Sequence, residues 1–277
     1  MAEELDWSAR KLDYEPPEID TSKAHSARLY DYLLGGKDNY PPDREAAEEV
    51  IKVTPAVVAS ARQNRLFLQR LTRHLAAKEG ISQFLDIGTG IPTSPNVHET
   101  AQEVNPAAHV VYLDNDPIVL AHVRALLTSS PQGRVVYVQA DMRDADKVFA
   151  EPDLVCALDL SQPVALLVLS TLHFIQDADE ARELLGSYVD RLAPGSFVAL
   201  SLATTDDSPP VAANQALSVF QARGIPIMGR TQAEVAALFD GLELIEPGIV
   251  RVNRWRPDAN TDTEVRVGLY CGVARKP

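Results

Sequence analysis

Hydrophobic and polar residues follow different patterns in the two parts of the chain. After residue 80, short continuous apolar runs alternate with amphipathic stretches. Continuous apolar runs of this length are typical of strands that are covered on both faces. The runs cover residues 83–87, 109–113, 134–139, 164–169 and 196–202. Strands that alternate strictly with helices, such as the one expected at 177–192, predict an α/β fold with a parallel, doubly wound sheet.

The end of the chain has a different pattern from the alternating part. "TQAEVAALF" has helical spacing, whereas "LELIEPGIVRVNRW" and "EVRVGLYCGVARK" have the composition of strands. The polar loop "RPDANTDT" between these two segments is short enough to join an antiparallel pair. We therefore expect an antiparallel pair of strands at one edge of the sheet.

Before residue 80 the pattern is helical throughout. It predicts helices over residues 26–34, from about 42 to 53, and from 55 to 80, with Gly35-Gly36 ending the first. One face of the third helix carries Val57, Ala61, Asn64, Leu68, Leu71 and Leu75. We expect a loose arm at 1–24, a helical extension on the substrate side at 25–79, and a sheet domain at 80–277.

Length and charge limit the classes of ligand. The 277 residues suffice for one large domain with an appendage or for two small domains, and the formal net charge is −13. A protein that holds a phosphate backbone needs clustered Lys and Arg, so nucleic-acid binding is not expected. The acidic start "MAEELDW" differs from a signal peptide, and the longest apolar stretch, 163–175, is too short to span a bilayer. We expect a cytoplasmic protein with a small-molecule ligand and no membrane contact; its oligomeric state is not predicted.

The cysteines and histidines show no pattern that indicates metal binding. Cys156 and Cys271 lie among apolar neighbours without CxxC spacing, which predicts two buried, chemically inactive thiols. The six histidines lack HxxxH or HxH spacing. No metal site is therefore predicted.

The stretch "FLDIGTGIPT" joins the first predicted strand to a glycine turn. Asp86 ends the apolar run, and Gly88 and Gly90 follow at the carboxyl end of the strand, where open α/β sheets bind ligands. A dinucleotide fingerprint would continue with a third glycine, but Thr93 occupies that position and Pro92 removes a backbone donor. The cationic S-adenosylmethionine suits the acidic residue better than a pyrophosphate does, although a glycine pair is also compatible with a simple tight turn.

The next two strands also end in carboxylates. Asp114 follows the second strand and is placed to accept hydrogen bonds from both ribose hydroxyls, whereas Asp116, next to Pro117, is interpreted as the cap of a helix through residue 127. Asp141 ends the third strand, where it can accept from an adenine amino group while Met142 packs on the ring. Three strand-end acids favour a cationic nucleoside over NAD.

Several of these segments resemble known motifs. "LDIGTG", "VYLDND", "QADMRD", "PVALLVLSTLHFI" and "APGSFVALS" are similar to class I S-adenosylmethionine-dependent methyltransferases. "ARLYDYLLGGKDNYPPDREAAEEV" and "RQNRLFL" resemble, more narrowly, a bacterial methyltransferase-like family once classified only as a domain of unknown function. The resemblance covers about residues 27–276. It implies a Rossmann-like fold with seven strands, the last antiparallel, and S-adenosylmethionine as methyl donor. The expected donor site comprises Asp86, Gly88, Thr89, Gly90, Asp114, Asn115, Asp141, Met142 and Ser170.

His173 is the candidate that the sequence offers for a catalytic base. It follows the fourth strand in "STLHF", and its ordinary pKa of about 6.5 would suit proton abstraction. A histidine whose hydrogen bonds are satisfied at the lip of the pocket is the favoured alternative. Catalytic residues are therefore left unassigned.

The segment "LGGKDNYPPDRE" combines flexible backbone with varied side chains. Lys37, Asp38, Asn39 and Tyr40 offer a cation, an anion, an amide and an aromatic ring in four residues. We interpret the segment as a lid over donor and acceptor, with a simple joint between helices as the alternative. Arg62 and Arg65 are candidates to hold Asp38, Asp43 or an acidic substrate, or to lie on a solvated helix face.

The sequence thus predicts a methyltransferase that acts on an unidentified small or medium-sized acceptor. A binding protein that keeps the donor pocket without catalysis is the first alternative, since no base is assigned. An NAD-dependent oxidoreductase is the second.

Overall fold

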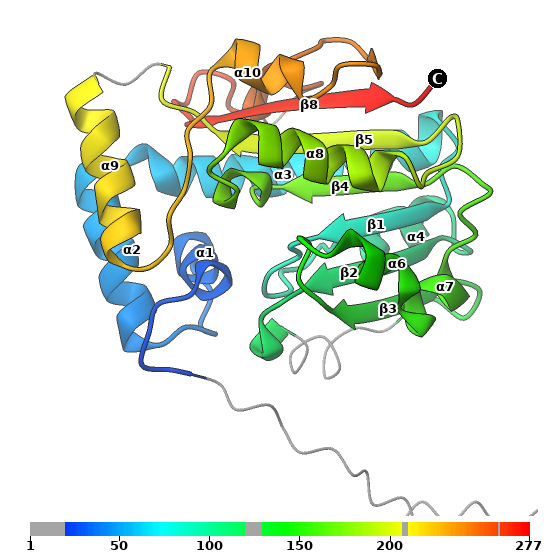
Figure 1. Cartoon of the computed structure of the whole chain (residues 1–277), viewed down its shortest axis with the longest axis horizontal. Helices are drawn as coiled ribbons and strands as arrows, with labels where there is room; N and C mark the ends of the chain where they lie inside the picture. The colour runs from blue at the N-terminus through cyan, green and yellow to red at the C-terminus, as the bar shows by residue number, and fades with distance from the viewer. Residues whose placement is uncertain (1–19, 120–128, 207–209, 260) are drawn as a thin grey trace, which may run out of the picture.

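The computed structural model describes residues 20–119, 129–206, 210–259 and 261–277. They contain one mixed sheet with the strand order β3-β2-β1-β4-β5-β8-β6, and β7 also pairs with β8 (Figure 1). The predicted α/β class is confirmed. The predicted arm at 1–24 lies almost wholly outside the described residues.

Five parallel strands form the main part of the sheet, and each lies within one residue of its predicted range. They are β1 (Gln83–Ile87), β2 (His109–Asp114), β3 (Arg134–Gln139), β4 (Ala165–Leu169) and β5 (Phe197–Ala203). β1 pairs with both β2 and β4, so the order of strands reverses between β1 and β4. Such a reversal opens a crevice at the carboxyl ends of the strands, where ligands bind.

The antiparallel end of the sheet differs in detail from the prediction. β8 (Leu269–Arg275) runs antiparallel to β5, as expected. The expected antiparallel pairing of the two end segments is confirmed, because β6 (Glu243–Leu244) and β7 (Val250–Arg251) both pair with β8. The single strand expected over "LELIEPGIVRVNRW" is wrong, because these two short strands are separate and a 3₁₀ turn, η3 (Val252–Arg254), follows them. Pro247 has no N–H for a ladder, and Gly248 has a φ of 77°, so the chain cannot stay extended there.

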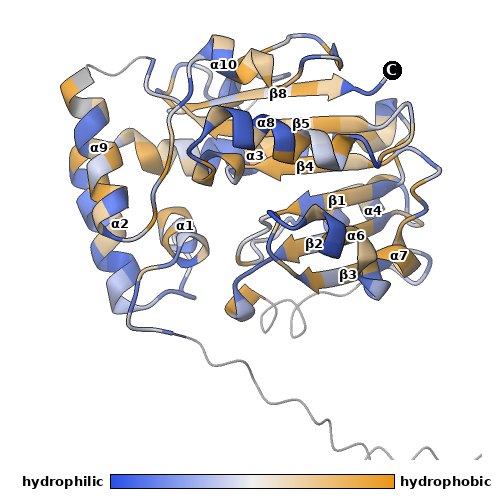
Figure 2. Cartoon of the chain, in the orientation of Figure 1, coloured by the Kyte–Doolittle hydropathy of each residue, from blue (hydrophilic) through white to orange (hydrophobic). Residues whose placement is uncertain are grey.

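Helices cover both faces of the sheet and bury two separate cores. On one face lie α6 (Ala145–Ala150), α7 (Pro152–Ala157), α8 (Ala178–Val189) and α10 (Gln232–Ala237). On the other face lie α3 (Ala56–Lys78) and α4 (Val97–Val104). The strands between these layers are largely apolar (Figure 2). Every described helix is too short or too polar to span a membrane.

The two cysteines lie in different environments. Cys271 is buried, but Cys156 is exposed, so the expectation of two buried thiols is wrong. α7 is one short helix that directs Leu154 and Ala157 to the core, which leaves Cys156 on its outer side.

The helix predicted to end at residue 127 follows β2. Its residues 117–119 are helical, and the rest lies outside the described residues.

A helical cap stands beyond the carboxyl ends of the parallel strands (Figure 1). It consists of α1 (Ser26–Leu34), α2 (Pro41–Val53), the first turns of α3, and α9 (Pro210–Ala222). The three N-terminal helices are confirmed, whereas α9 was not predicted. The cap has its own core of Leu29, Leu33, Ala46, Ala47, Ala61 and Ile225.

Candidate functional site

A cavity of about 800 Å³ lies between the strand ends and the helical cap. Its floor comes from the residues that follow β1 to β5, and its roof from α1, α2, α3 and α9. This volume is within the range of small-molecule sites. The cavity therefore occupies the position that the strand reversal predicts.

The turn after β1 brings its backbone to the cavity. Gly88 has a φ of 68°, and a Cβ atom there would lie 2.4 Å from the side chain of Thr171, so only glycine fits. Gly90 has a φ of 67°, and a Cβ atom there would meet no atom within 4 Å. A ligand can thus approach the backbone closely at Gly90.

Asp114 is held rigidly at the end of β2. Its Oδ2 accepts a hydrogen bond from the Gly90 N–H at 2.8 Å, and its Oδ1 accepts one from the Asp116 N–H at 2.9 Å. Burial raises the pKa of Asp114 despite these bonds. Each carboxylate oxygen can accept a further hydrogen bond, which a ribose hydroxyl can supply.

Asp116 has a different role from Asp114. Its Oδ1 accepts from the Ile118 N–H at 3.0 Å, which confirms the predicted cap. Its Oδ2 lies 2.8 Å from His25 Nδ1 and 4.0 Å from Arg28 Nε, so Asp116 also joins the sheet domain to the start of α1. Burial alone would raise the pKa of Asp116, but the His25 ring and the Ile118 N–H bring it below the ordinary value.

Asp86 is the most perturbed carboxyl group at the strand ends. Its side chain is only 4% exposed, and burial raises its pKa to about 7, although Arg65 opposes the shift. A carboxyl with this pKa is poised between its two states at neutral pH. A nearby cation would favour the charged state.

Arg65 holds the loop that follows the glycine turn. Its guanidinium donates to the carbonyls of Thr93 and Pro95, the latter at 3.0 Å, and to Asn96 Oδ1 at 3.1 Å. The suggestion that Arg65 holds Asp38 or Asp43 is therefore wrong. Arg65 points from α3 toward the loop after β1. The residue that lies beside Asp43 is Arg28, with 3.6 Å between Arg28 Nε and Asp43 Oδ1.

The structure brings all the predicted donor residues to one cavity. Asp141 accepts from the Arg143 N–H at 2.9 Å, and the Met142 carbonyl accepts from Tyr188 Oη at 2.8 Å, which fixes this loop. The lining includes Asp86, Gly88, Thr89, Gly90, Asp114, Asn115, Asp141, Met142 and Ser170. These residues come from the ends of four neighbouring strands.

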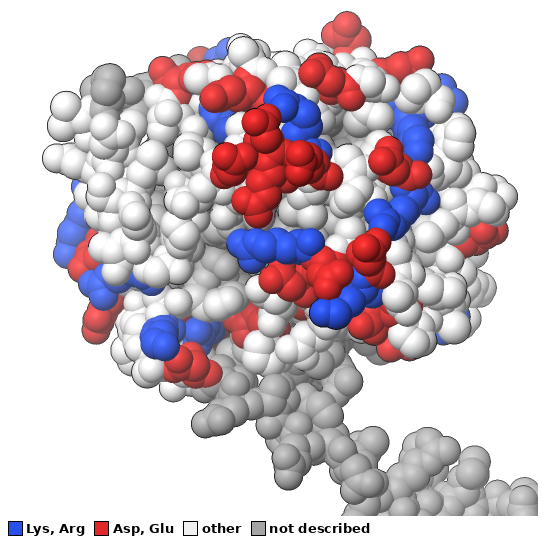
Figure 3. Space-filling view, in the orientation of Figure 1, with Lys and Arg blue, Asp and Glu red and all other residues white. Residues whose placement is uncertain are grey.

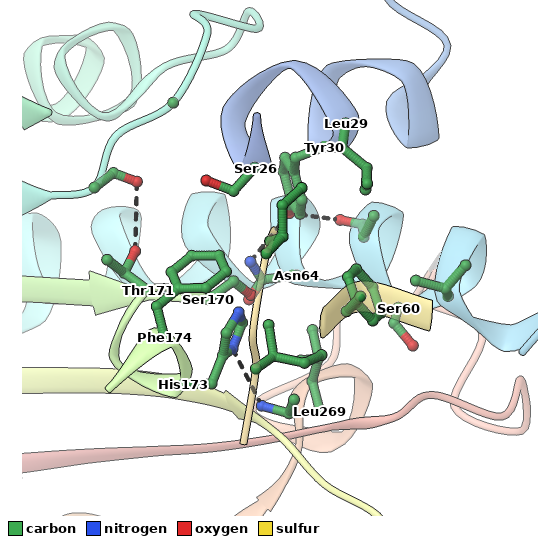
Figure 4. Close-up of a pocket in the computed structure, with 18 of the residues that line it drawn as sticks. Ser26, Leu29, Tyr30, Ser60, Asn64, Ser170, Thr171, His173, Phe174 and Leu269 are labelled. Atoms are coloured by element: carbon green, nitrogen blue, oxygen red, sulfur yellow. Dashed lines mark hydrogen bonds between the residues drawn. The ribbon is translucent and has the colours of Figure 1, made fainter. Parts of the chain in front are cut away.

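His173 also lines the cavity, within a 3₁₀ turn, η2 (Leu172–Phe174) (Figure 4). Burial, with a contribution from Arg230, lowers its pKa to about 3. Its Nδ1 accepts a hydrogen bond from the Ala203 N–H at 3.4 Å. A histidine that is neutral down to such a low pH is a poor general base, which agrees with the alternative that its hydrogen bonds are satisfied.

A polar chain crosses the middle of the cavity, and it was not predicted from the sequence. Asn64 Nδ2 donates to Tyr30 Oη at 3.1 Å, and Ser201 Oγ donates to Asn64 Oδ1 at 2.7 Å. The Ser170 N–H donates to Ser201 Oγ at 2.9 Å, and Ser170 has a strained φ of 54°. Figure 4 shows Tyr30, Asn64 and Ser170 together. The one available signal was an asparagine on the apolar face of α3.

The candidate lid lies outside the cavity lining. Asp31 Oδ2 accepts from the Asp38 N–H at 2.9 Å and from Asn39 Nδ2 at 2.8 Å, while Tyr40 lies under Arg28 with 5.5 Å between guanidinium and ring centre. Of the six lid or substrate candidates, only Arg65 lines the cavity; the others are Lys37, Asp38, Asn39, Tyr40 and Arg62.

Among the solved structures that match this chain are two that share 40% or more of its sequence. A DUF574 family protein from Streptomyces avermitilis is 48% identical with a TM-score of 0.91, and the match covers 94% of this chain and 100% of that one. A presumed methyltransferase from Thermobifida fusca is 40% identical with a TM-score of 0.86, covering 95% and 99%.

A more distant match shows the fold alone. Human N-acetylserotonin methyltransferase, solved with S-adenosylmethionine, is 13% identical with a TM-score of 0.50, covering 92% of this chain and 63% of that one. No curated protein matches the chain.

The chain also matches a protein family over almost its whole length. That family is described as S-adenosyl methyltransferase, and the match covers residues 13–277. It agrees with the class I methyltransferase fold, with S-adenosylmethionine as the cofactor, and sets aside the NAD-dependent alternative. The chain belongs to the S-adenosyl methyltransferase family.

Proposed function

We propose that this protein transfers a methyl group from S-adenosylmethionine to a small acceptor bound beneath the helical cap. The observation that carries the proposal is that one cavity joins the strand-end residues to the cap. A donor at the strand ends and an acceptor under the cap would then share a single enclosed space. Such an arrangement favours transfer because it holds both reactants together and excludes water.

The strand ends offer partners for each part of the donor. Asp114 would accept from the ribose hydroxyls, and Asp141 with Met142 would hold the adenine. Asp86 would face the ammonium group. Arg65 Nε is buried and has no hydrogen-bond partner among the described residues, so it is available to the methionyl carboxylate. The residues present therefore fit a cationic nucleoside with an amino-acid end.

The bound donor would supply an activated methyl group on a sulfonium. The chain's own contribution is to position the acceptor, because His173, with a pKa of about 3, is not charged or basic at neutral pH. Ser170 and Asn64 lie where the donor strand ends meet the cap, and their hydrogen bonds fix that position. We assign these residues to positioning rather than to proton transfer.

Surface charge supports a small acceptor rather than a nucleic acid. The formal net charge is −13. Figure 3 shows acidic side chains gathered over α8 and near α6, with basic groups interspersed rather than forming a continuous stripe. A phosphate backbone would be repelled by such a face.

Calorimetry and turnover together test the proposal. S-adenosylmethionine and S-adenosylhomocysteine should bind to the full chain, and NAD should not. Incubation with donor and a cell extract should yield a metabolite that gains one methyl group, detected by mass spectrometry, together with S-adenosylhomocysteine. Binding without any methylated product would favour the non-catalytic binding protein, and binding of NAD alone would overturn the proposal.

A further inference from the structure

We propose that the acceptor is an aromatic hydroxy acid, whose ring lies under the helical cap, whose hydroxyl oxygen receives the methyl group, and whose carboxylate is held by Arg251 and Arg266. This proposal rests on the proposed function and adds the chemical class of the acceptor. Three features of the cavity support it: the apolar cap, the placement of charge, and the hydrogen-bond donors in the middle.

The part of the cavity beneath the cap is apolar. α9 contains no Lys, Arg, Asp or Glu in its thirteen residues, and its inner side faces α2 and the cavity. The apolar lining includes Leu29, Leu33, Val57, Phe174, Leu217, Phe220, Ile225 and Ile227. Burial of a ring compound against such walls is favourable, whereas a sugar or a peptide would lose hydrogen bonds with water.

The carboxylates of the cavity lining are confined to one end, where Arg65 and Arg143 accompany them, and two further arginines line the other end. Among the described lining residues, the carboxylates are Asp86, Asp114 and Asp141, all at the donor strand ends. Arg251 and Arg266 line the other end, next to β8. They also line a second cavity of about 470 Å³, so they stand at the border between the two spaces. An anionic group on the acceptor would lie at this border.

Arg251 is held in place before any ligand arrives. Its guanidinium carbon lies 4.0 Å from the centre of the Tyr270 ring, and the two residues are paired across β7 and β8. A planar guanidinium suits a carboxylate because it can donate two parallel hydrogen bonds. Arg266, which is more exposed, supplies the second cation.

The middle of the cavity presents hydrogen-bond donors. Because Nδ1 of His173 accepts from the Ala203 N–H, the ring proton lies on Nε2, and the ring can donate but not accept there. Figure 4 shows His173 beside Ser170, whose hydroxyl can also donate. An oxyanion accepts from both groups. A neutral amine has one lone pair, and a hydrogen bond accepted with it would occupy the pair that must attack the methyl group.

The absence of a suitable base at His173 also favours an acidic hydroxyl. Its pKa of about 3 means that the acceptor must ionise without its help, which an aromatic hydroxyl with a pKa near 10 or below can do. An electron pair of the acceptor oxygen forms the new O–C bond while the electrons of the donor's S–C bond return to sulfur. The oxyanion and the sulfonium are both neutralised, so no proton moves in this step.

Binding of 6-hydroxy-2-naphthoate, whose hydroxyl and carboxylate lie at opposite ends of the ring system, to the full chain saturated with S-adenosylhomocysteine tests the proposal by calorimetry. We expect binding by the wild-type protein and a loss of about tenfold in affinity for Arg251→Gln and for Arg266→Gln, since each removes a charge-assisted contact. Arg254→Gln is the matched control, because Arg254 lines only the second cavity, and its affinity should stay within about twofold. 1-Naphthylamine, which has neither the hydroxyl nor the carboxylate, should bind at least about tenfold more weakly.

The affinity for S-adenosylhomocysteine is measured first, so that the two proposals can fail separately. If the wild-type protein does not bind it, the proposed function is overturned. If it binds while 6-hydroxy-2-naphthoate does not, or while the amine binds as tightly, only the acceptor class is overturned. The acceptor class is also overturned if both arginine variants keep the wild-type affinity for the naphthoate. Should Arg251→Gln fail to fold because its contact with Tyr270 is lost, the exposed Arg266→Gln carries the test alone. A product of the naphthoate that is one methyl group heavier would support both proposals.

Discussion

The two ends of the cavity are built in different ways. On the proposed donor side, most of the lining lies at or directly after the ends of β1 to β4, and the set carries the three carboxylates Asp86, Asp114 and Asp141. On the acceptor side, the lining comes from α1, α3, α9 and the start of β8, and its groups are mostly apolar. The donor side is therefore formed mainly by short segments at the strand ends. The acceptor side is formed by segments that are distant in the sequence and pack together in the fold.

The difference also appears in the energetics. The donor side keeps buried carboxylates whose desolvation opposes folding, as the raised pKa of Asp86 shows. The acceptor side buries apolar groups, which stabilises the folded chain without a ligand. We infer that a bound ligand stabilises the donor side more than it stabilises the acceptor side. The predictions below test this contrast, beginning with the largest expected effect.

Asp86→Asn should stabilise the ligand-free protein at high pH. The folded pKa of Asp86 is raised to about 7, so its contribution to stability is complete below pH 4 and is lost as the pH rises through 7. Asn resembles the protonated state at every pH. The gain in unfolding free energy should grow from near zero at pH 4 to about 2–4 kcal/mol at pH 8, measured by urea unfolding.

Asp141→Asn is the control for this experiment. Asp141 is also a strand-end carboxylate, but it is exposed and bonded to Arg143. Its effect on the unfolding free energy should stay within about 0.5 kcal/mol across the same pH range. A flat difference curve for Asp86→Asn would show that the donor side carries no such desolvation cost.

Asp114→Ala should weaken binding of S-adenosylhomocysteine by about one to two decades. Charge-assisted hydrogen bonds to the ribose contribute roughly 1.5–3 kcal/mol, and the variant also frees the Gly90 N–H, which Asp114 holds. Calorimetry measures the affinity. An affinity unchanged within about twofold would remove Asp114 from the donor site.

The meeting of the strand-end residues in one cavity could be predicted because most of its signals are local in the sequence. Asp86 and Asp114 follow apolar runs directly, and parallel strand ends meet at one edge of a sheet. Gly88 marked the turn, although the reason for it, contact with Thr171, is visible only in the structure.

The acceptor side could not be predicted because its contacts join distant positions. Asn64 and Ser201 are 137 residues apart, and nothing near either residue indicates the other. α9 has no charged face to mark it as amphipathic, so its sequence resembles a loop. On the proposed donor side, the partners of Arg65 were not predicted either, because they lie 28 to 31 residues away in a loop whose path the sequence does not specify.

Asp116→Ala should lower stability and leave donor affinity nearly intact. The change removes the cap on Ile118 and the pairing with His25, so we expect a loss of about 1–2 kcal/mol in unfolding free energy. Affinity for S-adenosylhomocysteine should change by less than about threefold. Thermal unfolding and calorimetry on the same sample measure both quantities, and the reversed result would exchange the roles of Asp114 and Asp116.

The smallest effect on stability and on ligand release is expected at the segment that the sequence suggested as a lid. The Asp38 N–H and the Asn39 side chain already donate to Asp31 without a ligand, and the Tyr40 ring packs near Ile118 and Val119. These contacts are those of a joint between α1 and α2. The position of the segment outside the cavity lining therefore favours the alternative over the lid.

Hydrogen exchange and a Tyr40→Ala variant separate the two roles. For a joint, the Asp38 amide should exchange slowly with or without S-adenosylhomocysteine, since the hydrogen bond to Asp31 is present in both states. Tyr40→Ala should then lower the melting temperature by about 2–4 °C, as expected for a loss near 1 kcal/mol in a chain of this size. The rate of S-adenosylhomocysteine release should change by less than about twofold, because a side chain outside the cavity does not hold the ligand. Marked slowing of exchange on ligand addition, together with faster release from Tyr40→Ala, would instead establish a lid that closes over the donor side and would extend the ligand's stabilising effect into the cap.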